Sequence, residues 1–95
     1  MEINEVLKER GSRYGPFSGH AAIAQSLKDV FEGEGAPTSF ETNWYFLEDF
    51  HKEALEMIAH KIGRILNGDP NYDDSWRDIA GYAQLVVDIL NGKDT

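Results

Sequence analysis

The chain has 95 residues, no cysteine and a formal net charge of −8, from seventeen Asp and Glu against nine Lys and Arg. This size predicts one domain over residues 1–95, and so small a domain without disulfide bonds commonly gains stability by associating with further copies. The acidic balance argues against duplex nucleic acid and anionic membranes as partners, because both need a basic protein surface.

The N-terminal third predicts two helices separated by a loop. Apolar residues recur at helical spacing over residues 2–10, and Gly11 is expected to end that helix. Residues 11–17 hold two glycines and a proline, which predicts a turn-rich loop. Ser18 is a suitable N-cap for a second helix over residues 19–32.

The middle of the chain is harder to assign. Residues 33–37 are expected to form a linker, and residues 38–47 an irregular or short helical segment. The aromatic run at 44–47 is expected to pack over the core or against a neighbouring subunit.

The C-terminal half predicts a helical hairpin. A long helix over residues 49–67 ends at Gly68, and a last helix over about 75–90 is expected to be capped by Asp73 or Asp74. Because a short turn joins them, the two helices are expected to lie antiparallel. The whole chain therefore predicts an all-α fold, a small helical bundle with a C-terminal antiparallel helical hairpin.

The long helix carries a polar stripe opposite its apolar arc. On a helical wheel five side chains share this stripe: Glu53, Glu56, His60, Arg64 and Asn67. One interpretation is a solvated face with weak i,i+4 pairs. The other is a binding face, because His60 and Asn67 are unusual in a merely solvating role and the adjacent carboxylates of Glu53 and Glu56 are ligands that Mg²⁺ accepts.

The last helix has two apolar faces. The first is expected to face the core and comprises Trp76, Ile79, Ala80, Ala83, Val86, Val87 and Leu90. The second is expected to meet another subunit or another helix and comprises Asp78, Tyr82, Leu85 and Ile89. Asp78 either gains from its position in the first helical turn or becomes partly desolvated and needs a partner or a metal.

Several further side chains allow two interpretations each. Arg10, Arg13 and Tyr14 in the predicted loop suit contacts with phosphates or bases, but such a segment is as often a surface turn. Lys61 at the edge of the polar stripe is either a solvated lysine or a phosphate ligand. The chain has no P-loop and no dinucleotide-binding glycine motif.

Four segments resemble a family of small phage and prophage proteins of unknown function: Glu9–Gly15, Glu53–Ile62, Arg64–Pro70 and Asp74–Tyr82. They cover about a third of the chain. The resemblance implies a phage source and a role inside the host cell during infection. A cytoplasmic location is expected, since the first residues lack the basic start and apolar run of a signal peptide.

A weaker resemblance is to the MazG-like all-α nucleotide pyrophosphohydrolases. That family carries Glu-x-x-Glu on one helix and Glu-x-x-Asp on the next, which implies a Mg²⁺ site here on Glu53, Glu56 and Asp78. The chain departs from the second motif, because Ser75 stands where the family has its acid and the nearest carboxylate is Asp74.

Three functional hypotheses follow. The first is a protein without a cofactor that binds a nucleotide or a nucleotide-derived signal, as a homo-oligomer, in a pocket between subunits lined by Arg10, Arg13, Tyr14, His60, Arg64, Asn67 and Tyr82. The second is a Mg²⁺-dependent nucleoside triphosphate pyrophosphohydrolase, in which Glu53, Glu56 and Asp78 bind the metal and Lys61 or Arg64 steadies the phosphates. The third is a structural or protein-interaction module.

Overall fold

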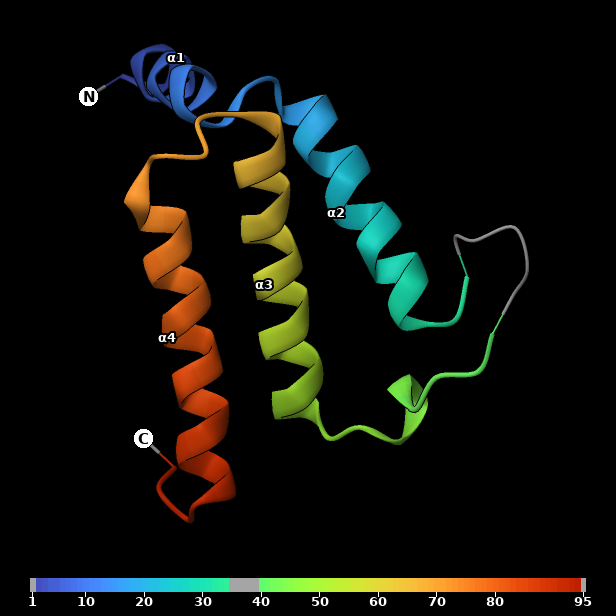
Figure 1. Cartoon of the computed structure of the whole chain (residues 1–95). Coiled ribbons are helices and arrows are strands. Elements are labelled where there is room, and N and C mark those ends of the chain that lie inside the picture. The colour runs from blue at the N-terminus through green and yellow to red at the C-terminus, as the bar shows by residue number, and fades with distance from the viewer. Residues whose placement is uncertain (1, 35–39, 95) are drawn as a thin grey trace.

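The computed structural model describes residues 2–34 and 40–94, and these residues form helices and connecting segments but no strand. The elements are α1 (Ile3–Tyr14), α2 (Phe17–Phe31), a 3-10 segment (Trp44–Phe46), α3 (Asp49–Asn67) and α4 (Asp73–Leu90). Helices α2, α3 and α4 lie side by side in one layer with α3 in the middle, and α1 lies across one end of it (Figure 1). The predicted all-α fold and its antiparallel C-terminal hairpin are confirmed.

The first helix is longer than its sequence pattern indicates. Gly11 does not end it, because α1 continues to Tyr14 and includes most of the predicted loop. The helix ends at Gly15, whose φ of 74° lies where side chains other than glycine are strained. The side-chain amide of Asn67 then donates to the carbonyls of Tyr14 at 2.8 Å and Pro16 at 2.7 Å. Helix α1 can therefore run on, because a distant residue pairs the carbonyls at its end.

The predicted N-cap of α2 is wrong. Helix α2 begins at Phe17, and its N-cap is Pro16 rather than Ser18. The φ of Pro16 is −61°, and the Asn67 amide holds its carbonyl in place, so the chain enters the helix two residues earlier. Helix α3 has the predicted bounds and is followed by Gly68.

Helix α4 begins earlier than predicted. It starts at Asp73 with Tyr72 as N-cap, and neither Asp73 nor Asp74 caps it through a side chain. The Asp74 carboxylate instead accepts a hydrogen bond from the Tyr72 hydroxyl at 2.8 Å. Both carboxylates still lie in the first turn, where the helix dipole favours negative charge.

The connection between α2 and α3 is described only in part. Residues 35–37 of the predicted linker and residues 38–39 of the next segment lie outside the described residues. Within 44–47 the structure has a 3-10 turn, in which Trp44 is buried and stacks on Phe31 with ring centroids 5.2 Å apart. The prediction that the aromatic run covers the core is confirmed for Trp44, whereas Tyr45 and Phe46 are exposed.

The faces of α4 differ from their predicted roles. The stripe expected to face the core is largely exposed, and its five exposed members are Trp76, Ala80, Ala83, Val87 and Leu90. The side of α4 that lines a pocket with α3 instead joins Val86 of this stripe to Tyr82 and Ile89 of the second, and all three are half-buried. The prediction failed because the apolar arc of α4 is wider than one neighbouring helix can cover.

Two glycines with opposite roles, Gly11 within α1 and Gly15 directly after it, give a stability prediction. A side chain at Gly15 would overlap the Asn67 carbonyl and would have to adopt the positive φ, so Gly15→Ala should lower the free energy of unfolding by more than about 2 kcal/mol. Gly11 lies within the helix with open space around it, so Gly11→Ala should raise that free energy by roughly 0.5–1 kcal/mol. Urea denaturation at equal protein concentrations checks both; equal stability of Gly15→Ala and wild type contradicts the account.

Candidate functional site

The C-terminal end of α1 is locked onto the C-terminal end of α3. The Asp69 amide donates to the Arg13 carbonyl at 2.7 Å, beside the two hydrogen bonds from Asn67. Glycine is needed at two close approaches, since a side chain at Gly19 would overlap the Asn67 side chain and one at Gly68 would overlap the Arg13 carbonyl. Asn67 thus positions the site through the backbone.

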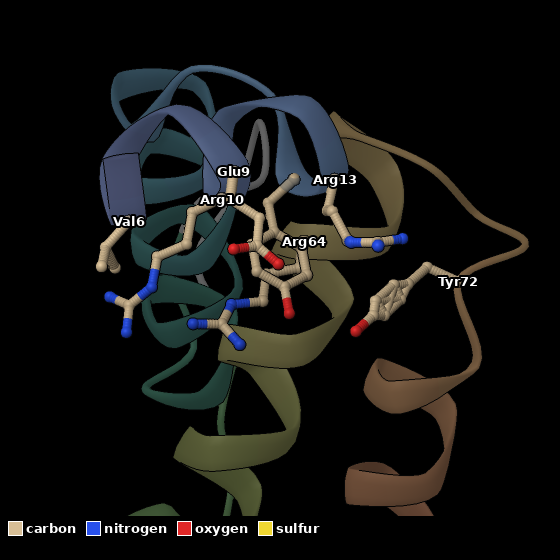
Figure 2. A pocket seen from close by; sticks show the side chains of 7 residues that line it. Val6, Glu9, Arg10, Arg13, Arg64 and Tyr72 are labelled. Carbon is tan, nitrogen blue, oxygen red and sulfur yellow. The ribbon is translucent and has the colours of Figure 1, made fainter. Parts of the chain in front are cut away.

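This junction creates a pocket of about 250 Å³, called the Arg pocket here. Its lining residues are Val6, Glu9, Arg10, Arg13, Tyr14, Arg64 and Tyr72. In Figure 2 the side chains of Arg10 and Arg13 extend from α1 to opposite sides, Arg64 of α3 lies between them, and Arg13 lies above Tyr72 of the turn before α4. Three guanidinium groups against the carboxylate of Glu9 leave a local charge of +2 on a chain whose net charge is −8.

Two guanidinium groups of the Arg pocket lie over tyrosine rings. Arg64 is 4.2 Å from the ring centroid of Tyr14, and Arg13 is 4.2 Å from that of Tyr72. The two tyrosines stack on one another with centroids 6.1 Å apart and an interplanar angle of 26°. Stacking uses the faces of the guanidinium groups and leaves their N–H edges for hydrogen bonds to oxyanions.

The arginines of the Arg pocket keep most of their donors free. Among the described residues, the ion pairs are Lys61 with Asp78 and Arg77 with Asp73, so neither pair uses a pocket arginine. The Nε atom of Arg64 is buried and has no hydrogen-bond partner within the described part of the chain. A buried donor without a partner costs stability.

Two histidines lie next to Arg64. The rings of His20 on α2 and His60 on α3 have centroids 4.3 Å apart, and His20 is 4% exposed. Burial, together with the neighbouring His20 and Arg64, lowers the pKa of His60 to about 4. Burial also lowers the pKa of His20. Both rings are therefore neutral at pH 7, where each offers one donor and one acceptor.

The lowered pKa of His60 predicts a loss of stability in acid. The groups that disfavour its protonation are His20 and Lys28 of α2 and Lys61 and Arg64 of α3. Because the folded state binds a proton less readily than the unfolded state, stability should be full above about pH 6.5 and should fall as the pH drops from there toward about 4. His60→Gln should flatten this fall in thermal melts between pH 7 and 4.5. An unchanged pH profile in that variant contradicts the prediction.

Lys61 and Asp78 form an ion pair across α3 and α4. Lys61 is only 8% exposed, and its Nζ lies 3.1 Å from a carboxylate oxygen of Asp78. Lys61 was expected to be either a solvated lysine or a phosphate ligand, and it is neither. A helical wheel shows on which side of α3 a residue lies but not which helix packs against that side. Asp78 therefore has a partner, and that partner is a lysine.

The remaining predicted site residues lie away from the Arg pocket. Glu53 and Glu56 line a shallow depression near the start of α3, and Glu56 is eight residues, about 12 Å along the helix axis, from Arg64. Tyr82 lines an apolar pocket between α3 and α4. Among the residues that the structure describes, no three His, Asp or Glu side chains are grouped to hold a metal ion. Within one chain, Glu53, Glu56 and Asp78 do not meet, and the Mg²⁺ site stays a prediction.

Comparison with known proteins gives a family. A family model described as a domain of unknown function, DUF6378, matches residues 2–90, which include every residue of the Arg pocket. The chain belongs to this family. No curated protein and no solved structure matches it. Because the family description states no activity, the function of this DUF6378 protein has to be argued from its site.

Sequence reasoning found part of the site and missed the rest. Arg10, Arg13, Tyr14 and Arg64 were candidates by residue type, and the structure brings them together. It missed Tyr72, whose position in a turn gave no reason to pair it with Arg13, 59 residues earlier. In the described part of the chain, no helix has both the length and the apolar composition needed to cross a membrane.

Proposed function

We propose that this protein binds a nucleotide or a nucleotide-derived signalling molecule and so removes it from circulation. The observation that carries the proposal is the Arg pocket, in which three arginines with free N–H edges meet two stacked tyrosines. Guanidinium groups suit phosphate oxygens in bidentate geometry, and aromatic faces suit bases.

The electrostatics support a small anionic ligand rather than a polyanion. A surface of net charge −8 repels a long nucleic acid, whereas a phosphate within the Arg pocket meets a local charge of +2 at contact distance. Such a site is selective because its attraction is short-ranged.

The position of the carboxylates supports binding rather than hydrolysis. A phosphate at Arg64 lies about 12 Å along α3 from Glu56, and Asp78 is already paired with Lys61. The resemblance to small phage proteins supports a signal of host defence as the sequestered molecule.

We also propose that the protein acts as a homo-oligomer that associates through α4. The exposed members of its first apolar stripe recur at spacings of 4, 3, 4 and 3 residues, the pattern of a helix–helix seam: Trp76, Ala80, Ala83, Val87 and Leu90. The polar face of α4 lies beside this stripe and contains Arg77, Gln84 and Asp88. We call the stripe the α4 seam.

The exposed area supports a second copy as the occupant of the α4 seam. The chain exposes 6825 Å², whereas a compact protein of 10.7 kDa exposes about 5500 Å². Its radius of gyration is 15.3 Å against about 12 Å for a compact chain of this length. The excess of about 1300 Å² exceeds the roughly 800 Å² that each partner buries in a standard interface.

A titration tests the binding proposal. Adenosine 5′-monophosphate and adenosine differ by the phosphate alone, so calorimetry should show at least tenfold tighter binding of the nucleotide if the Arg pocket holds a phosphate. Equal affinities, or binding of neither compound nor of the guanosine, cytidine and uridine monophosphates, would contradict the proposal.

A further inference from the structure

A second and larger cavity adjoins the Arg pocket. It has a volume of about 480 Å³ and lies between α1, α2 and α3. It shares Arg10, Tyr14 and Arg64 with the Arg pocket, so the two adjoin along these side chains. We call it the histidine cavity, and its other lining residues are Leu7, Gly11, Gly15, Pro16, Phe17, His20 and His60.

The two parts of this site differ in charge. The lining of the histidine cavity beyond the shared residues has no acid, lysine or further arginine. Its two histidines are neutral at pH 7, because burial lowers the pKa of both. The positive charge is therefore concentrated at the shared wall and in the Arg pocket, and the far side of the histidine cavity is uncharged.

The uncharged side carries aromatic surface and an unpaired polar atom. Phe17 is 76% exposed and meets His20 edge-on with ring centroids 5.8 Å apart. The Nε2 atom of the buried His20 ring has no hydrogen-bond partner in the described residues, and neither has Nε of Arg64. An exposed aromatic face is a surface on which a flat base can stack.

We propose that the histidine cavity receives the base of a nucleotide whose phosphate lies in the Arg pocket. The ligand class is then a nucleoside monophosphate unit, because base and phosphate occupy adjoining pockets that share Arg10 and Arg64. This inference rests on the proposed function, since the Arg pocket provides the phosphate end. The cavity volume lies within the range of about 300–1000 Å³ that small-molecule sites have.

The test separates the base from the phosphate. Calorimetric titration of the full chain compares adenosine, guanosine, cytidine and uridine 5′-monophosphates with ribose 5-phosphate, which lacks a base. The best monophosphate should bind at least tenfold more tightly than ribose 5-phosphate. Phe17→Ala and His60→Ala should each lower its affinity at least fivefold and change that of ribose 5-phosphate less than twofold.

Phe46→Ala is the matched control. Phe46 is 89% exposed on the 3-10 segment and lines neither pocket, so its removal should leave all affinities unchanged. Phe17 is itself exposed, and its variant should keep the helical circular dichroism of the wild type.

Each failure has its own signature. If ribose 5-phosphate binds as tightly as every nucleotide, and Phe17→Ala changes nothing, the base is not held in the histidine cavity but the Arg pocket still binds phosphate. If none of these phosphates binds, the proposed function fails and this inference fails with it.

Discussion

Arg64→Ala should lower the affinity for the best-bound nucleoside monophosphate ten- to hundredfold. The substitution removes a charge-assisted hydrogen bond worth about 1.5–3 kcal/mol, and each 1.4 kcal/mol is a tenfold change in affinity. Arg64 is the arginine shared by both pockets, and its guanidinium is held in place by the Tyr14 ring. The helical content should not change, because in the described residues Arg64 forms no ion pair.

Arg77→Ala provides a control with the same change of charge. Arg77 is exposed on α4 and pairs with Asp73 at 2.9 Å, outside both pockets. An exposed pair of this kind contributes only about 0–1 kcal/mol, so the variant should bind the nucleotide as the wild type does. Calorimetric titration of the three proteins decides the matter; equal affinities of Arg64→Ala and wild type contradict a phosphate contact at Arg64.

Val87→Glu should dissociate the oligomer. Val87 is 46% exposed in the single chain, near the middle of the α4 seam, so a glutamate there is tolerated by the isolated fold. In an assembly the charge would be buried without a partner, which costs several kcal/mol. In a two-fold interface both protomers carry the substitution, so this cost arises twice. The association constant should therefore fall at least hundredfold, and light scattering should report the monomer mass at micromolar concentration.

Gln84→Glu adds the same charge to the polar face of α4. Gln84 is exposed and donates to Asp88 at 2.7 Å, on the polar face that lies beside the α4 seam. This variant should keep the mass of the wild type. The proposed association through α4 is wrong if the wild type is a monomer, or if Val87→Glu retains the oligomeric mass with an unchanged circular dichroism spectrum.

The bounds of α3 could be predicted from the sequence, but the end of α1 could not. The apolar period and Gly68 delimit α3, because both act within a few residues. The end of α1 could not be predicted in the same way, since Gly11 and Gly15 are equal as local breakers. The hydrogen bond that decides between them joins Asn67 to Tyr14, which are 53 residues apart.

The site shows the same limit. Residue type alone marked Arg10, Arg13, Tyr14 and Arg64 as candidates, because arginine and tyrosine suit phosphates and bases. Their meeting depends on how α1 lies across the end of α3, which no periodicity encodes. Lys61 is a candidate that the structure places outside the site. The helical wheel puts it beside the polar stripe, whereas in the structure α4 covers it and Asp78 pairs with it.

Mass spectrometry of small molecules tests the central claim most directly. The purified full chain is mixed with a cell extract enriched in nucleotides, separated by size and denatured, and the released and remaining compounds are measured with and without Mg²⁺. The account predicts that one phosphate-bearing nucleotide is retained intact by the wild type and is lost from Arg64→Ala. Consumption of a nucleotide that requires Mg²⁺, or retention of no nucleotide at all, would contradict it.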